Sequence, residues 1–235
     1  MNRRRFTSFY LLLLSGPWLG VHENSYAFTL SDLSDAEASQ GLKAALEKGA
    51  SSAVKTLGQA NGFFGNDKVR IPLPGYLEDG AKLMRMLGQG ARLDDLVVAM
   101  NRAAEAAVPL ARDMLVSAVK SMNVQDAKNI LIGGETAVTQ FFVEKTRQPL
   151  SQKFLPVVTK TTARVDLAAK YNQLAGKAAS MGLVKGEQAT IEQYVTGKTL
   201  DGLYFMIGEE EKKIRQDPVS AGSAVLKKVF GALQR

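Results

Sequence analysis

The sequence predicts an all-α protein, and three observations support this fold class. The chain is rich in alanine and has almost no alternation of β-branched and polar residues. Apolar residues recur every three to four positions over residues 93–122, which is the period of a helix face. Glycines and prolines separate such segments. We therefore expect residues 28–235 to form a single-domain bundle of about eight or nine helices, with one extended proline-rich segment near residues 69–75.

The first helix is predicted over residues 34–57. Ser34 and Glu37 have the spacing of a capping box, in which the side chains of the first and fourth residues satisfy free backbone N–H groups. Gly58 follows the last apolar position of this segment and is a typical helix stop.

An irregular stretch is predicted next, over residues 61–75, because glycines and prolines cluster there. Residues 69–74 should be extended, since a residue that precedes proline avoids the helical region. A short helix over residues 76–87 follows, and Gly88 ends it.

Pro109 lies inside the apolar stripe of residues 93–122, which indicates either a kinked helix or two helices that meet there. Asn123 and Asp126 open the next short helix, and the pair Gly133 and Gly134 closes it.

The second half of the chain is predicted to continue as helices, with Pro156 kinking the second of them and Gly182 and Gly186 marking a loop. These helices are expected over residues 135–147, 149–179, 187–195, 199–215 and 218–233. The sequence has no internal repeat and no long polar linker, so a single domain is expected.

The first 27 residues have the pattern of a signal peptide. A basic start at residues 3–5 precedes an apolar run, and Ser25-Tyr26-Ala27 supplies the small residues that a signal peptidase requires. The apolar run has roughly 15 residues where a spanning helix needs ~20, so we expect cleavage after Ala27 and no transmembrane span in the mature chain. The sequence thus predicts a periplasmic protein. The arginines leave both Sec and twin-arginine export open.

The mature chain would lack several catalytic side chains. The sequence contains no cysteine, and its only histidine and tryptophan, His22 and Trp18, belong to the signal peptide. A histidine base, a cysteine nucleophile and a zinc site of the usual ligands are therefore excluded. We expect no cofactor and no metal. Whether the protein is an enzyme stays open, with a non-enzymatic role favoured.

Five residues are candidates for binding a ligand or a partner. Asn101 and Glu105 lie beside the apolar stripe, where they form either a polar cluster between helices or an exposed helix face. Glu209 begins the acidic run of residues 209–211, which is typical of a solvated face with pairs such as Glu209–Lys213 and Glu211–Arg215. Arg70 belongs to the extended segment, and Tyr204 lies on an apolar helix stripe that is typical of a core.

The end of the chain is basic and its last helix would be amphipathic, which suits docking onto the core or contact with anionic lipid headgroups. Nucleic acid is not an expected partner, because the predicted compartment lies outside the cytoplasm and the basic residues have no interleaved aromatic residues.

Five blocks of sequence carry a family resemblance. In order, they are residues 70–75 (RIPLPG), 101–109 (NRAAEAAVP), 153–157 (KFLPV), 194–218 (YVTGKTLDGLYFMIGEEEKKIRQDP) and 226–231 (LKKVFG). Together they resemble the exported bacterial family called domain of unknown function 4197 (DUF4197), over essentially residues 28–235. The resemblance implies an α-helical periplasmic protein of Gram-negative bacteria. It implies no reaction and no catalytic residues.

Three functional hypotheses follow. The first is a non-enzymatic binding or interaction protein that holds an apolar or lipid-like envelope ligand among aromatic residues such as Phe63, Phe142 and Tyr204. The second is a carboxylate-dependent envelope hydrolase with Glu105 or Glu209 as the acid. The third is a scaffold that binds another envelope protein through residues 70–75.

Overall fold

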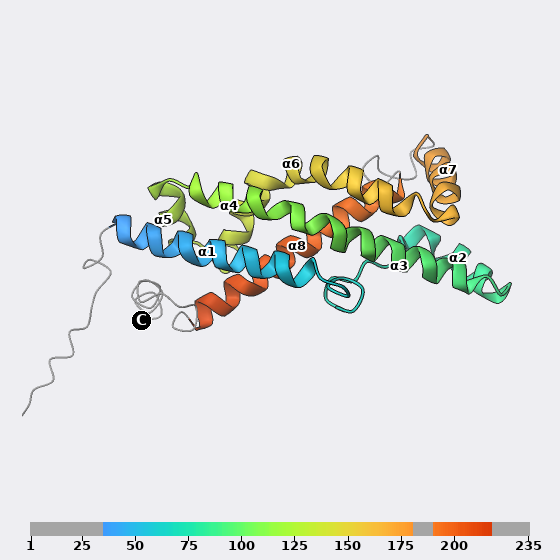
Figure 1. Ribbon diagram of the computed structural model, residues 1–235, viewed down its shortest axis with the longest axis horizontal. Coiled ribbons are helices and arrows are strands. Elements are labelled where there is room, and N and C mark those ends of the chain that lie inside the picture. Colours follow the sequence, from blue (N-terminus) through green and yellow to red (C-terminus); the bar gives the residue numbers. More distant parts are fainter. Residues whose placement is uncertain (1–34, 181–189, 218–235) are drawn as a thin grey trace, which may run out of the picture.

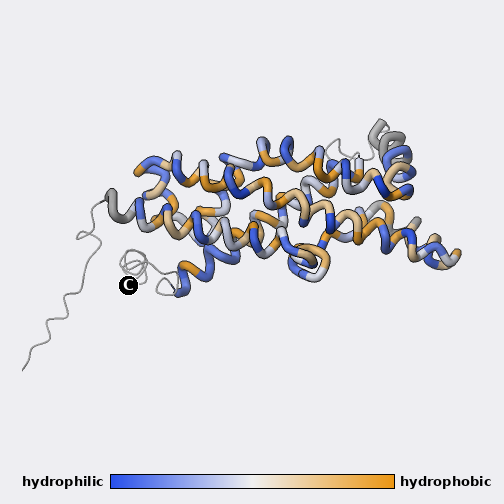
Figure 2. Tube along the Cα trace, in the orientation of Figure 1, coloured by the Kyte–Doolittle hydropathy of each residue, from blue (hydrophilic) through white to orange (hydrophobic). Residues whose placement is uncertain are grey.

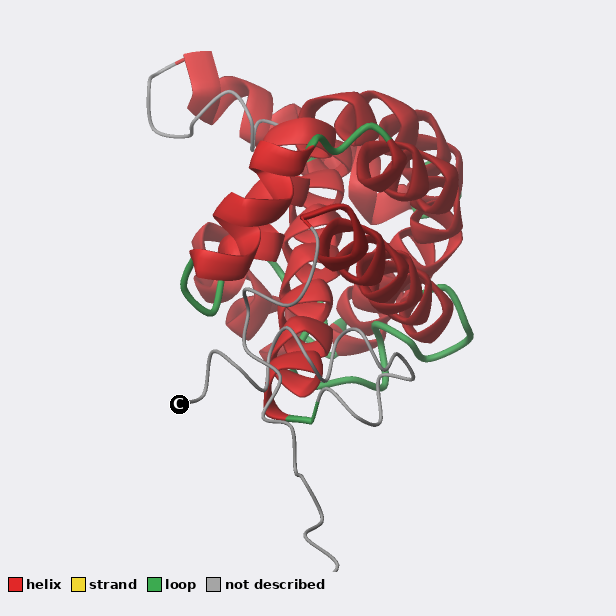
Figure 3. Cartoon of the chain, turned by 90° about the vertical axis from the view of Figure 1, so that its left-hand side faces the viewer, coloured by secondary structure: helices red, strands yellow, loops and turns green. Residues whose placement is uncertain are grey.

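A computed structural model describes residues 35–180 and 190–217, and every regular element in these two ranges is helical (Figure 1, Figure 3). The all-α class is thereby confirmed. The elements, including two short 3-10 helices η2 and η3, are α1 (Asp35–Leu57), η2 (Gly75–Leu77), α2 (Glu78–Met86), α3 (Gly90–Ala107), η3 (Val108–Ala111), α4 (Arg112–Lys120), α5 (Val124–Ile132), α6 (Ala137–Thr162), α7 (Asp166–Ser180) and α8 (Ile191–Gln216).

The helices form an elongated bundle. Helices α1, α3, α6 and α8 run along its long axis, with α5 towards one end and α2 and α7 at the other (Figure 1). Helix α6 packs mainly against α8 and α3, and α1 packs against α8 and α4. Polar and apolar residues alternate along each helix, as expected for helices that each turn one face inward (Figure 2). Within the described ranges, no helix combines the length and the hydropathy that a membrane crossing requires.

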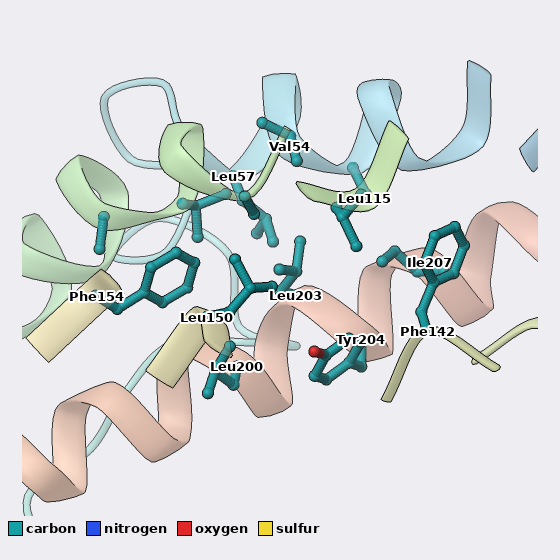
Figure 4. Close-up of a cluster of buried hydrophobic side chains, with 14 of the residues drawn as sticks. Val54, Leu57, Leu115, Phe142, Leu150, Phe154, Leu200, Leu203, Tyr204 and Ile207 are labelled. Atoms are coloured by element: carbon teal, nitrogen blue, oxygen red, sulfur yellow. The ribbon is translucent and has the colours of Figure 1, made fainter. Parts of the chain in front are cut away.

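The core lies where α1, α4, α6 and α8 meet. Figure 4 shows Leu57 of α1 and Leu115 of α4 facing Leu150 and Phe154 of α6, with Leu203 of α8 between them. All five side chains are fully buried. The buried apolar residues of all the long helices form one contiguous cluster.

Several predicted boundaries agree with the structure. Helix α1 ends at Leu57, and a Cβ at Gly58 would lie 2.9 Å from the ring of Pro109, so this turn needs a glycine. The capping box of Asn123 and Asp126 forms in both directions at the start of α5. At Pro109 two helices meet through η3, which was one of the two predicted alternatives. Residues 70–74 are not helical, although Val69 still belongs to the preceding turn.

Other helix boundaries differ from the predicted ones, so the chain is divided into helices at different positions. The break predicted before Pro149 is wrong, because α6 continues through Pro149 and Pro156 to Thr162. The single helix predicted over residues 149–179 is also wrong, because α6 ends at Thr162 and α7 begins at Asp166. The break predicted near Gly197 is also wrong, since α8 is one helix. The predicted signal peptide, the cap at Ser34, the loop at residues 182–186 and the helix over residues 218–233 lie outside the described residues.

Candidate functional site

Most of the predicted candidate residues lie in or against the connection between α1 and η2. We call this connection, residues 58–74, the clamped loop. It contains Asn61, a non-glycine residue with a positive φ of 65°. Three buried polar side chains from two other helices hold the loop: Asn101 and Glu105 from α3, and Tyr194 from α8.

Asn101 binds both backbone groups of Ile71. Its Oδ1 accepts a hydrogen bond from the Ile71 N–H at 2.9 Å, and its Nδ2 donates to the Ile71 carbonyl at 2.9 Å. The same Nδ2 also donates to the Val97 carbonyl of α3 at 2.8 Å. Both Asn101 and Ile71 are almost completely buried, so this pairing supplies hydrogen bonds that water cannot.

Glu105 holds the other end of the loop. Its Oε1 accepts hydrogen bonds from the N–H groups of Phe63 and Phe64, both at 3.1 Å. Its Oε2 pairs with Arg102 at 2.6 Å, and Arg102 also donates to Asn61 at 2.8 Å. The exposed-face interpretation of Asn101 and Glu105 is therefore wrong. Both are buried, and both bind loop backbone.

Tyr194 is the third contact, and it is not among the residues predicted from the sequence. Its hydroxyl donates to the Pro72 carbonyl at 3.1 Å. Pro72 is next to Ile71, so the extended part of the loop is attached to α3 on one side and to α8 on the other. A tyrosine on a helix stripe is normally interpreted as core, and only the fold places Pro72 within its reach.

The outer surface of the clamped loop combines cations with aromatic rings. The guanidinium of Arg70 lies 4.5 Å from the centroid of the Phe64 ring, and that of Arg102 lies 5.7 Å from it. Beside them, the Lys68 ammonium lies 6.0 Å from the ring centroid of Phe205, which is 43% exposed. We call these five residues, Phe64, Lys68, Arg70, Arg102 and Phe205, the loop face.

Glu209 borders the loop face. Its carboxylate accepts a hydrogen bond from Lys68 at 2.6 Å and lies 3.7 Å from Lys212. The hydrogen bond from Lys68 is the main reason why the pKa of Glu209 is lowered from its ordinary value. Four of the five predicted candidates, Arg70, Asn101, Glu105 and Glu209, are thus brought together at or beneath this face.

The fifth candidate, Tyr204, belongs to the core instead. It is 3% exposed, and its hydroxyl lies 2.9 Å from the Thr146 hydroxyl of α6 (Figure 4). Burial raises the pKa of Tyr204. The guanidinium of Arg147 lies 6.0 Å from its ring centroid.

The acidic run contains one buried member. Glu211 accepts hydrogen bonds from the N–H groups of Val138 and Thr139, in the first turn of α6, and pairs with Arg215 at 2.9 Å. The predicted pair of Glu211 with Arg215 is therefore present. The predicted pair of Glu209 with Lys213 is not, because Lys213 binds Glu210 at 2.7 Å.

The carboxylates of Glu105 and Glu209 are poorly suited to acid catalysis. Glu105 has both oxygens engaged by backbone N–H groups and Arg102. Glu209 has a lowered pKa, whereas a general acid needs a raised one near neutral pH. The described residues contain no group of three or more acidic residues that could hold a metal ion.

A comparison with models of known protein families shows to which family the chain belongs. The model of the family described as "Protein of unknown function (DUF4197)" matches residues 32–231. The chain belongs to the DUF4197 family. The suspected resemblance is confirmed, and the matched range of this DUF4197 chain includes the clamped loop and all three side chains that hold it. Searches of curated proteins and of solved structures gave no match.

Proposed function

We propose that this DUF4197 protein is a non-enzymatic interaction protein of the periplasm, which binds another envelope protein through the loop face. The observation that carries the proposal is that Asn101, Glu105 and Tyr194 all form hydrogen bonds to the backbone of the clamped loop. These buried polar groups hold a surface loop in one conformation. A loop held in this way loses little conformational entropy when a partner binds.

The residues that the loop presents are of the types that dominate protein interfaces. Arginine and aromatic side chains are enriched among the residues that contribute most binding energy. Arg70 is exposed, stacks on Phe64 and has no carboxylate partner among the described residues. Its guanidinium is therefore available for a carboxylate of the partner.

The packing gives less support to an apolar ligand held between the helices. Phe63, Phe141, Phe142 and Tyr204 are buried, so four of the six aromatic residues that suggested a cavity are part of the core, and the other two, Phe64 and Phe205, lie on the loop face. The scaffold hypothesis is favoured instead, in a modified form. Ile71 is buried with its backbone bound to Asn101, so the partner would contact the exposed side chains and not this backbone.

Site-specific photo-crosslinking in cells tests the proposal. A photoreactive residue in place of Asp67, which is exposed in the clamped loop, should give one discrete protein adduct in the envelope fraction. The same residue in place of Gln125, exposed on α5 at one end of the bundle, is the matched control and should give none. No adduct at position 67, or the same adducts at both positions, would contradict the proposal.

The compartment is tested separately, because it depends on residues 1–27. We expect the protein recovered from the periplasmic fraction to begin at Phe28, so its intact mass should correspond to residues 28–235. Recovery of the uncleaved chain from the cytoplasm would remove the periplasm from the proposal and leave the interaction at the loop face to be judged by crosslinking.

A further inference from the structure

The turn between α2 and α3 lies at the end of the bundle that α2 and α7 occupy (Figure 1). It carries three exposed apolar side chains, since Leu83 is 55%, Met86 78% and Leu87 67% exposed. The Leu87 N–H still donates to the Leu83 carbonyl at 3.0 Å, so the three residues share one helix face. We call them the apolar tip (Figure 2). An exposed ion pair of 2.8 Å between Arg85 and Asp94 joins the two helices here.

The packing of α2 does not account for the apolar tip. The helix is held by its opposite face, where Ala81 is buried and Leu77, just before the helix, packs against the core. Among the described elements, α2 packs mainly against η2 and α3. One exposed leucine is ordinary on a protein surface, but a group of neighbouring apolar side chains on one face is typical of a contact site.

Cations without protein partners lie next to the apolar tip. Arg92, in the first turn of α3, lines a recess of about 420 Å³ together with Arg164 and Lys170, which lie before and within α7. All three are exposed, and none makes an ion pair among the described residues. Two carboxylates, Asp95 and Asp166, line the same recess, so positive charge is in excess there.

The excess of positive charge extends over the whole tip. Residues 82–95, around the α2–α3 turn, and residues 160–170, around the recess, contain six lysines and arginines against three aspartates. The two acidic residues of α2, Glu78 and Asp79, belong to its first turn, about 10 Å along the helix from Met86.

This combination matches the boundary of an anionic phospholipid bilayer. At that boundary apolar side chains enter the acyl region, while lysine and arginine side chains contact the phosphate groups. The α2–α3 turn is the outermost part of this end of the bundle, so it can reach a flat surface (Figure 1). A second copy of the chain matches less well, because two such tips would bring like charges together.

We propose that the α2–α3 turn docks the protein on an anionic phospholipid surface. The apolar tip enters the headgroup boundary, and Arg92, Arg164 and Lys170 contact lipid phosphates. This contact is peripheral, because within the described ranges no helix is suited to cross a membrane. The site is separate from the loop face, and it stands or falls independently of the proposed function.

A fluorescent label at the apolar tip tests the contact directly. The chain has no cysteine, so Leu87→Cys gives the mature protein one site for an environment-sensitive fluorophore. Ile132→Cys is the matched control, because Ile132 is 78% exposed on α5, towards the other end of the bundle. Vesicles of phosphatidylethanolamine and phosphatidylglycerol should shift the emission of the label at position 87 to the blue, and should not shift that at position 132. Vesicles of phosphatidylcholine alone should give a much smaller shift.

Vesicle sedimentation measures the contribution of the apolar side chains. The double variant Met86→Ser and Leu87→Ser should bind the anionic vesicles at least tenfold more weakly than the wild type, with an unchanged Tm because both side chains are exposed. Ile132→Ser removes an equally exposed apolar side chain elsewhere and should bind like the wild type.

The same assay measures the contribution of the cations. The double variant Arg164→Glu and Lys170→Glu should also lower the affinity at least tenfold, and added salt should weaken the binding of the wild type. Arg92→Glu should weaken vesicle binding, whereas Arg70→Glu, on the loop face, should not.

Three results would overturn the proposal. The first is the absence of a blue shift at position 87. The second is an unchanged Kd for vesicles in the two double variants, which would assign any lipid contact to another part of the chain, such as its basic end. The third is a blue shift at position 87 that appears without vesicles and grows with protein concentration, which would assign the apolar tip to a second copy.

Discussion

The amide of Asn101 gives Ile71 the two hydrogen bonds that a neighbouring β-strand would give it. No aspartate or leucine could do the same, because the position must accept one hydrogen bond and donate another. The buried polar side chains at this site have a structural role, because Asn101, Glu105 and Tyr194 each bind a specific backbone group of the clamped loop.

Asn101→Ala should therefore be one of the more destabilising single substitutions in the protein. It leaves the buried N–H and carbonyl of Ile71 without partners, so we expect a loss of about 2–4 kcal/mol in the free energy of unfolding. Urea denaturation measures this loss. The matched control is Asn129→Ala, which removes an exposed amide bound to Gln125 and should change stability by less than about 0.5 kcal/mol. Equal effects of the two substitutions would show that Asn101 does not hold the loop.

The pKa of Glu209 reports the contact between α8 and the clamped loop. Lys68 holds this pKa below its ordinary value, so the stabilisation from the pair is present above that ordinary value and is lost as the pH falls through the lowered pKa. In Lys68→Met the pKa should rise towards its ordinary value, as a carboxyl NMR titration would show. Lys213→Met is the control, because Lys213 binds Glu210. If Lys68→Met leaves the pKa of Glu209 unchanged, the two side chains do not pair in solution.

At the scale of the elements, the first turn of α6 depends on a carboxylate from another helix. Glu211 of α8 accepts from the N–H groups of Val138 and Thr139, and Arg215 balances its charge while donating to the Ile130 carbonyl of α5. One ion pair thus joins three helices. A negative group is also favourable at this position because it faces the positive end of the α6 dipole.

Glu211→Ala should destabilise the protein by about 3–5 kcal/mol, since it removes the carboxylate that pairs with Arg215 and leaves two N–H groups of α6 without this acceptor. Glu210→Ala is the control: among the described residues Glu210 makes only an i,i+3 pair with Lys213, so this variant should lose no more than about 1 kcal/mol of stability. Thermal unfolding of the two variants measures this difference in stability. A Tm for Glu211→Ala as high as that of Glu210→Ala would contradict the assigned role.

The element boundaries show what the sequence could and could not predict. The capping box at Asn123 depends on residues three positions apart and was predicted correctly. Pro149 and Gly197 are locally unfavourable in a helix, yet α6 and α8 continue through them because each helix is held along its length by packing against the other. Local rules that treat a proline or glycine as a stop cannot include this packing.

The candidate site was predicted only in part for the same reason. Asn101 and Glu105 could be identified as polar residues beside an apolar stripe. Their partners are 30 to 42 positions away in the sequence, and Tyr194 reaches across 122 positions to Pro72. Arg70 could be predicted as a candidate because it belongs to the extended segment, but its stacking on Phe64 depends on the conformation that these long-range contacts impose.

At the scale of the whole molecule, the elongated bundle supports one irregular loop whose polar backbone is bound from inside and whose arginine and aromatic side chains face outwards. The family match covers this arrangement. We propose that the molecule acts by binding through the loop face, with Arg70 as the cation offered to the partner.

The most direct test is the yield of the adduct formed from a crosslinker at position 67 in two charge-reversal variants. Arg70→Glu changes the loop face, while Arg92→Glu makes the same change at an exposed arginine of α3 outside it. We expect Arg70→Glu to reduce the yield at least tenfold with an unchanged Tm, and Arg92→Glu to leave the yield as in the wild type. An undiminished yield in Arg70→Glu, or an equal loss in both variants, would contradict the claim.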